Sequence, residues 1–125
     1  MFWYGRLPYD KTLSLERQCD IMLALYDPAI PNHRYAAPNK LYEAMMLGKP
    51  VLTCSGIGWD EEIEGQETGV LIDFGAEGIK DGLDELYRRR DQWRAMGENG
   101  RARYAEQYSW QTMKQRIRGI YSLLG

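Results

Sequence analysis

Residues 35–50 read YAAPNKLYEAMMLGKP and contain the start and stop signals of one helix. Asn39 is a residue type that caps helix N-termini. Gly48 can take the left-handed conformation that ends a helix, and Pro50 prevents continuation. The pattern predicts a helix from Asn39 to about Leu47. Its composition is apolar on almost every side, which predicts that the helix is largely buried.

Short apolar runs on both sides of this helix predict strands. Residues 20–26 form an almost continuous apolar run, as expected for a strand buried on both faces. Further strands are expected at residues 2–4, 50–53 and 69–72, and a short helix at about residues 11–18. Strands that alternate with helices predict a Rossmann-like α/β fold, a parallel sheet flanked by helices.

From about residue 79 onward, apolar residues recur at helical spacing and predict three extra C-terminal helices. Ser109 is the expected N-cap of the third helix. Each apolar face should pack against an apolar surface. Three closing helices exceed what one strand–helix–strand unit needs, so we expect an arm that packs elsewhere. The three sets are Ile79, Leu83, Leu86 and Tyr87; Trp93, Met96, Gly100 and Tyr104; and Trp110, Met113, Ile117, Ile120, Tyr121 and Leu124.

The composition is that of one ordinary globular domain. Of the 125 residues, 44% are hydrophobic and 27% charged, with a formal net charge of −2, so no basic nucleic-acid-binding face is indicated. Cys19 and Cys54 lack CxxC spacing, and His33 is the single histidine, which argues against a zinc site and favours buried free thiols. No apolar run reaches the roughly 18 residues that span a bilayer, and we expect a cytoplasmic domain.

Glu43 is the exception in the otherwise apolar helix. Burying a carboxylate costs several kcal/mol unless it is paired or hydrogen-bonded, and a position near a helix N-terminus offsets only about 0.3–1 kcal/mol. Two explanations stay open: a protein donor satisfies Glu43, or the carboxylate holds two ligand hydroxyls such as those of a ribose. The N–H groups of Lys40, Leu41 and Tyr42 lack helical partners and predict an anion site for a diphosphate.

The helix and its surroundings resemble a known family. Residues 39–45 followed by residues 48–51 resemble the donor-site helix of the family 4 retaining glycosyltransferases, which have the GT-B fold. Other stretches resemble the neighbouring strands and closing helices of that family in the same order, so the resemblance covers nearly the whole chain. These stretches are residues 20–28, 69–72, 96–101 and 108–110.

The resemblance implies roles for individual residues. The backbone amides of Asn39, Lys40 and Leu41 would bind the donor diphosphate, and Glu43 would hold the ribose. Leu7, in the loop after the first expected strand, would contact the nucleotide base through its backbone. The donor substrate would be a nucleoside diphosphate sugar, and the resemblance implies neither a metal nor a cofactor.

The resemblance also implies a larger enzyme. Residues 1–125 would be its C-terminal, nucleotide-sugar-binding lobe, incomplete at the N-terminal edge. The acceptor-binding domain and a basic Arg and Lys pair would precede Met1, so the isolated chain is expected to be inactive. The full enzyme would be a hexosyltransferase of polysaccharide biosynthesis that moves a sugar to an acceptor hydroxyl. Membrane contact is left open only for that full enzyme.

Two residues beside the helix leave two functions compatible with the sequence. Tyr35 stands eight residues before Glu43, where many family members carry another glutamate that faces the donor sugar, so the catalytic residues stay unknown. Arg34 either reaches a phosphate or is a solvated loop residue. The alternative to a donor-binding domain is a non-catalytic α/β interaction module that kept the fold and lost the ligand.

Three other groups of side chains have ordinary structural explanations. The acidic side chains of residues 61–67 are expected to form a solvated face. Trp59 is expected to be buried, with a place beside the sugar pocket as the alternative. Arg88, Arg89 and Arg90 lie near a helix end, where the helix dipole favours cations.

Overall fold

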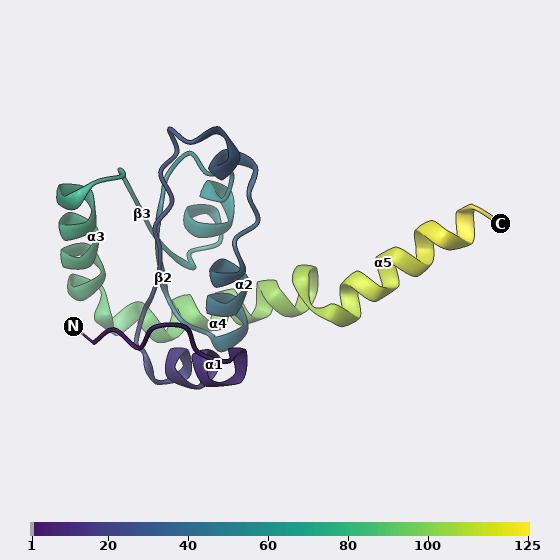
Figure 1. Ribbon diagram of the computed structural model, residues 1–125, viewed down its shortest axis with the longest axis horizontal. Coiled ribbons are helices and arrows are strands. Elements are labelled where there is room, and N and C mark those ends of the chain that lie inside the picture. Colours follow the sequence, from purple (N-terminus) through teal and green to yellow (C-terminus); the bar gives the residue numbers. More distant parts are fainter. Residues whose placement is uncertain (1) are drawn as a thin grey trace.

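A three-stranded parallel sheet organises the structure, which is a computed structural model that describes residues 2–125 (Figure 1). The helices and strands in chain order are α1 (Tyr9–Gln18), β1 (Met22–Ala24), η1 (Pro31–Tyr35), α2 (Asn39–Leu47), β2 (Val51–Cys54), η2 (Glu61–Gly65), β3 (Gly69–Ile72), α3 (Ala76–Arg88), η3 (Arg90–Gln92), α4 (Trp93–Arg103), η4 (Tyr104–Tyr108) and α5 (Trp110–Leu123). The elements named η are short helical turns that differ from the α-helix.

The sheet has the strand order β1-β2-β3, and both neighbouring pairs are parallel. Met22 of β1 lies opposite Val51 of β2, which lies opposite Gly69 of β3. Gly69 approaches the carbonyl oxygen of Val51 so closely that a β-carbon would collide with it. The predicted Rossmann-like α/β fold, with its parallel sheet between helices, is confirmed.

The two faces of the sheet carry separate apolar cores, because successive residues of a strand point to opposite faces. Val51 packs with residues of α2, whereas the next residue, Leu52, packs with residues of α3 and α4. Figure 1 shows α2 and α3 on opposite sides of β2 and β3. The first core contains Met22, Ala24, Leu41, Ala44, Met45, Val51, Ile57, Trp59 and Ile63, and the second contains Leu52, Cys54, Ile72, Leu86 and Met96.

Helix α2 ends where its stop signal predicts. Gly48 has φ 67° and ψ 45°, a left-handed conformation that glycine adopts without strain. The Arg101 guanidinium of α4 donates a hydrogen bond to the carbonyl oxygen of Leu47, 3.0 Å away, and adds positive charge at the helix C-terminus. As predicted, most of the helix is buried, and its buried residues are Leu41, Glu43, Ala44, Met45 and Leu47.

Helix α4 packs across the end of α2 through two glycines. Gly97 lies directly against the carbonyl oxygen of Gly48, and Gly100 lies against Met45. A β-carbon at residue 97 would collide with that backbone oxygen, so the close approach of the two helices requires glycine there. The contact fixes the position of α2 relative to the rest of the fold.

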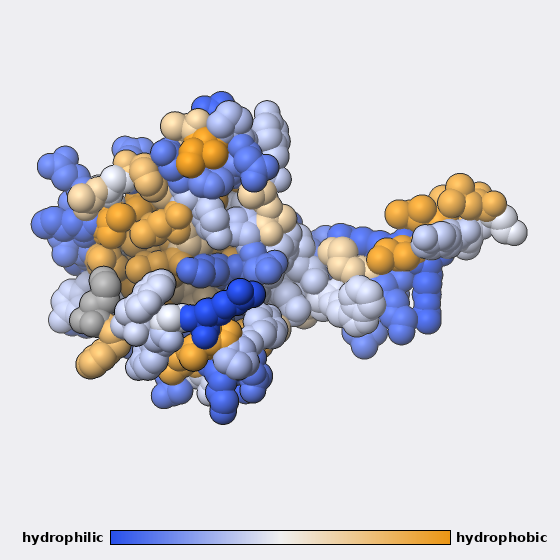
Figure 2. All heavy atoms as spheres, viewed as in Figure 1, coloured by the Kyte–Doolittle hydropathy of each residue, from blue (hydrophilic) through white to orange (hydrophobic). Residues whose placement is uncertain are grey.

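Helix α5 has an amphipathic pattern, but its apolar face is largely uncovered by residues 2–125. None of its residues is buried. Figure 1 shows α5 extending away from the sheet, and Figure 2 shows apolar side chains on its surface. The predicted N-cap is confirmed, because the Thr112 N–H donates to Ser109 Oγ at 3.2 Å. The exposed large apolar residues of α5 and its end are Trp110, Ile117, Ile120, Tyr121, Leu123 and Leu124.

Two local expectations are wrong. Residues 2–4 form no strand, and their aromatic side chains are exposed, because β propensity produces a strand only where a sheet edge and an apolar layer are available. Cys19 is exposed just after α1, whereas Cys54 is buried in β2 as predicted. Among residues 2–125, no helix has both the length and the apolar composition that crossing a bilayer requires.

Candidate functional site

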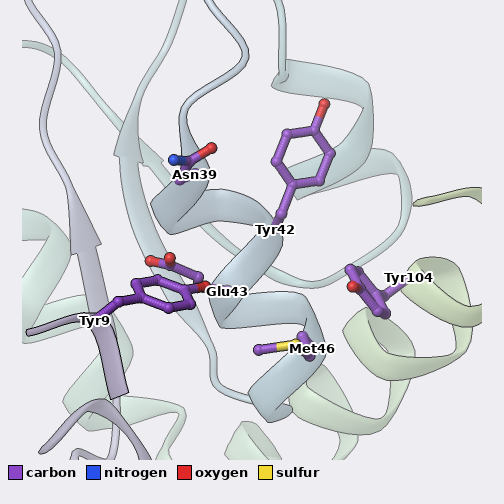
Figure 3. A pocket seen from close by; sticks show the side chains of 6 residues that line it. All are labelled: Tyr9, Asn39, Tyr42, Glu43, Met46 and Tyr104. Carbon is purple, nitrogen blue, oxygen red and sulfur yellow. The ribbon is translucent and has the colours of Figure 1, made fainter. Parts of the chain in front are cut away.

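A cavity of about 200 Å³ lies along α2, between α1 and the start of η4 (Figure 3). In Figure 3, Tyr9 and Glu43 lie on one side of α2, and Tyr42 and Tyr104 lie on the other. The cavity therefore combines one carboxylate with aromatic and apolar walls. Its lining residues are Tyr9, Asn39, Tyr42, Glu43, Met46 and Tyr104.

Glu43 is the charged residue of this lining and is only 9% exposed. Tyr9 lies beside it, and the pKa of Tyr9 is raised first by desolvation and then by the neighbouring Glu43 carboxylate. A carboxylate offers about four acceptor positions. The Glu43 carboxylate lines the cavity, where these positions are available to a ligand.

A second carboxylate, Glu16 of α1, lies near Glu43. Its Oε2 atom is buried and has no hydrogen-bond partner among residues 2–125. Desolvation and, second, the negative charge of Glu43 raise the pKa of Glu16, whereas the charge of Lys40 lowers it. The two carboxylates repel each other. A hydrogen-bond donor or a positive charge between α1 and α2 would therefore be stabilised by both of them.

Glu16→Gln is expected to raise the Tm at neutral pH, because it removes a desolvated charge that Glu43 repels. The pKa of Glu16 is higher in the folded state than in the unfolded state. Its contribution to stability is therefore complete below the unfolded-state pKa of about 4.3 and is lost as the pH rises through the folded-state pKa. Solvent screens a partly exposed residue, so the expected gain is roughly 2–4 °C. Thermal unfolding of both proteins from acid to neutral pH measures it, and an unchanged or lower Tm at neutral pH would contradict the repulsion.

The N-terminus of α2 differs from the predicted one. Asn39 is the first helical residue rather than the cap, because Pro38 already supplies the extended residue before the helix, with φ −67° and ψ 129°. The Leu41 N–H is not free, since it donates to the carbonyl oxygen of Pro38 at 3.1 Å. The N–H groups of Asn39 and Lys40 have no acceptor among residues 2–125, and both residues are exposed. The anion-binding capacity of this helix start therefore rests on these two amides.

Five predicted site residues lie outside the cavity lining, namely Lys40 and Leu41 of α2 together with Arg34, Tyr35 and Leu7. Arg34 is exposed, and its Nε donates to a backbone carbonyl oxygen 2.9 Å away. Tyr35 is 88% exposed at the end of η1, and Leu7 is partly buried in the segment before α1. The lining thus includes Asn39 and Glu43 from the predicted set but not the other five residues.

The aromatic walls of the cavity are not identified from the sequence. Asn39, Tyr42, Glu43 and Met46 are spaced three or four residues apart along the helix and share one of its faces. That spacing would identify Tyr42 and Met46 once the functional side of the helix is known. The tyrosines from α1 and η4 are distant in sequence, so no local pattern connects them with α2.

The acidic run of residues 61–67 is not a uniformly solvated face. The Glu62 side chain is 14% exposed, and Arg103 donates two hydrogen bonds to its carboxylate, 2.7 and 2.6 Å long. The Tyr108 hydroxyl donates a third bond, 2.6 Å long. The hydrogen bonds from Arg103 hold the pKa of Glu62 below its usual value. Burial first, and the hydrogen bond to Glu62 second, raise the pKa of Tyr108 to about 12. The expectation is wrong for Glu62 because its partners lie far away in sequence.

This Glu62 network supports one wall of the cavity. The Tyr108 ring meets the Tyr42 ring edge-to-face with 5.2 Å between centroids, and Tyr42 meets Trp59 in the same way at 5.0 Å. Trp59 is buried as expected, and its Nε1 donates to the carbonyl oxygen of Ala36 at 3.4 Å. Such edge-to-face packing fixes the Tyr42 ring beside the cavity.

Glu62→Gln is expected to lower the Tm at pH 7 by roughly 4–8 °C, because Arg103 loses its ionic partner while the side-chain shape is kept. Since the folded-state pKa of Glu62 is lowered, its contribution is present above the unfolded pKa of about 4.3 and is lost as the pH falls through the folded value. The Tm of the variant should therefore approach the Tm of the wild type in acid. Glu64→Gln, an exposed neighbour, is the control for thermal unfolding. An equal fall in Tm in both variants, or a fall in Tm that persists in acid, would contradict the ion pair between Glu62 and Arg103.

The fold and cavity define a Rossmann-like α/β domain with a carboxylate-lined cavity. Residues 1–103 match the family described as Glycosyl transferases group 1, and the chain belongs to this family. It is 27% identical over 93 residues to the capsular polysaccharide biosynthesis glycosyltransferase CapM of Staphylococcus aureus, a match that covers 74% of the chain and 24% of that protein. The chain thus spans about a quarter of the length of this curated relative. No solved structure matches the chain.

Proposed function

We propose that the chain is the nucleotide-sugar-binding lobe of a retaining glycosyltransferase of family 4 with the GT-B fold. The observation that carries the proposal is Glu43, a 9% exposed carboxylate that faces a cavity of about 200 Å³ along α2. Membership of the group 1 glycosyl transferases supports a nucleotide sugar as the ligand of this cavity. The resemblance of residues 39–51 to a donor-site helix supports it further.

In this proposal, Glu43 accepts hydrogen bonds from the 2′ and 3′ hydroxyls of the donor ribose. Charge-assisted bonds of this kind are strong, and the largely buried position strengthens them. The amides of Asn39 and Lys40 bind the diphosphate, aided by the helix dipole and the Lys40 ammonium group. The backbone of Leu7 contacts the base. Ribose and phosphate have opposite charge requirements, and the first half of α2 meets both.

The proposed reaction transfers the sugar to an acceptor hydroxyl with its anomeric configuration kept. The bond from the anomeric carbon to the diphosphate oxygen breaks, and the α2 amides stabilise the charge that the diphosphate gains. The scheme uses no metal. We propose that a separate domain binds the acceptor and covers the exposed apolar face of α5, so the chain by itself should not transfer sugar.

Amide NMR titration with uridine diphosphate and guanosine diphosphate tests the binding proposal. We expect dissociation constants in roughly the millimolar range, because a single lobe makes only part of the contacts. The largest shift changes should fall on the amides from Asn39 to Glu43. Saturable changes confined to other parts of the chain would contradict the placement of the nucleotide.

The second candidate function is a non-catalytic α/β interaction module. Two observations favour it: the uncovered apolar face of α5 and the exposed Tyr35 at the position where many family members carry a glutamate. The same titration separates the candidates, since an interaction module that lost its ligand should show no shift changes with any nucleoside diphosphate.

A further inference from the structure

Tyr42 lines the cavity on the side of α2 opposite Glu43, and two other aromatic side chains hold its ring (Figure 3). The Tyr42 ring meets Tyr108 and Trp59 edge-to-face, with 5.2 and 5.0 Å between the ring centroids. Tyr108 and Trp59 also contact each other, with centroids 5.9 Å apart. Because the three rings form a closed cluster, the Tyr42 ring has little freedom to turn.

Tyr108 is held in turn by a partly buried ion pair. Its hydroxyl donates a hydrogen bond to Glu62 Oε1 at 2.6 Å, and Arg103 donates two bonds to the same carboxylate at 2.7 and 2.6 Å. Bidentate pairs between arginine and a carboxylate have a fixed geometry and are strong. Within residues 2–125, the cavity lining contains neither Tyr108 nor these two partners. Tyr108 can therefore affect a ligand only through its neighbours, and Tyr42 is the neighbour that lines the cavity.

The two sides of the cavity suit different parts of one ligand. The Glu43 carboxylate accepts hydrogen bonds and suits hydroxyl groups, whereas the negatively polarised face of an aromatic ring such as Tyr42 suits C–H groups. A sugar ring carries hydroxyls at its edge and C–H groups on its faces. The cavity of about 200 Å³ is smaller than the roughly 300–1,000 Å³ of pockets for drug-sized ligands, so it fits one such ring rather than an entire nucleotide.

We propose that Tyr42 is a ligand-contact residue, whose ring packs against the C–H side of the ribose, and that Tyr108 is a positioning residue, which keeps the Tyr42 ring in place. This inference rests on the proposed function, which assigns the ribose hydroxyls to Glu43. The aromatic cluster is already formed without a ligand, so binding does not have to order the Tyr42 ring.

NMR of the protein with saturating uridine diphosphate or guanosine diphosphate tests the contact. We expect a nuclear Overhauser effect between the Tyr42 ring protons and the ribose protons of the nucleotide. Tyr42→Leu keeps an apolar side chain but removes the ring, and it should weaken nucleotide binding roughly twofold to tenfold. Tyr121→Leu, the same substitution at an exposed tyrosine of α5, is the control and should leave the affinity unchanged.

A double-mutant cycle tests the positioning role. Tyr108→Leu should weaken nucleotide binding roughly twofold to fivefold in the wild-type background, because Tyr42 loses its support. In a Tyr42→Leu background it should weaken binding no further, since the ring that it positions is absent. A general loss of stability would weaken binding in both backgrounds. Tyr108→Phe keeps the ring but loses the bond to Glu62, so its affinity should fall between those of Tyr108→Leu and the wild type.

Each remaining outcome identifies which claim fails. If the nucleotide binds and Glu43→Ala weakens binding, but Tyr42→Leu binds as tightly as the wild type, the contact role is wrong and the proposed function stands. Where Tyr42→Leu does not fold, absence of the Overhauser effect in the wild-type complex overturns the contact role.

The positioning role fails separately from the contact role. Equal weakening by Tyr108→Leu in both backgrounds overturns it. Where a leucine variant does not fold, a Tyr108→Phe affinity equal to that of the wild type overturns it. If the wild type binds neither nucleotide, the proposed function fails and this inference falls with it.

Discussion

Glu43→Ala is expected to weaken binding of uridine diphosphate by roughly 10-fold to 100-fold. A hydrogen bond to a charged group contributes about 1.5–3 kcal/mol, and each 1.4 kcal/mol corresponds to about tenfold in affinity. The carboxylate faces the cavity and is 9% exposed, so solvent screens these bonds little. NMR titration of the variant beside the wild type measures the change, which should appear as a loss of saturation at concentrations that saturate the wild type.

The matched control for this variant is Glu64→Ala. Glu64 is exposed and lies outside the cavity lining, so its removal should leave the affinity unchanged. Glu62→Ala is an unsuitable control, because the loss of the pair with Arg103 would disturb Tyr108 and, through it, the Tyr42 wall. Equal effects of Glu43→Ala and Glu64→Ala would contradict the ribose role of Glu43.

Gly97→Val is expected to destabilise the fold by at least about 3 kcal/mol. The added β-carbon would collide with the carbonyl oxygen of Gly48, and a backbone atom cannot move aside as a flexible side chain can. Helix α4 would have to shift away from the end of α2. Urea unfolding followed by circular dichroism measures the loss, and a variant that is unfolded without denaturant also agrees with the prediction.

Gly119→Val is the matched control for the glycine contact. Gly119 lies in the exposed helix α5, and a β-carbon there would meet no atom within 4 Å. Surface substitutions of this kind usually change stability by no more than about 0.5 kcal/mol. If Gly97→Val were no more destabilising than Gly119→Val, the close packing of α4 on α2 would be wrong.

Local signals in the sequence predict the central helix and the fold class. The left-handed Gly48 and the following Pro50 end α2 where predicted, because both act through backbone geometry that needs no distant partner. The run at residues 20–26 contains β1, but the expectation that this strand is buried on both faces is wrong, because Leu23 is 41% exposed whereas Met22 and Ala24 are buried. Glu43 also stands out locally, as an acidic residue within an apolar helix.

Features that depend on distant partners are not predictable in the same way. Glu62 and Arg103 are separated by 41 positions, so the acidic run gives no sign that one of its members is paired. The aromatic residues 2–4 have strand-forming side chains but no sheet edge to join, and tertiary context decides that outcome. The place of Tyr9 in the cavity lining depends on how α1 meets α2, which no spacing within α1 specifies.

A crystal structure of the chain soaked with uridine diphosphate tests the central claim most directly. We predict ribose hydroxyl oxygens about 2.5–3.0 Å from the Glu43 carboxylate, the range of an O–H···O hydrogen bond, with a phosphate at the amides of Asn39 and Lys40. A nucleotide bound with its ribose away from Glu43, or with its phosphates away from the start of α2, would contradict the account.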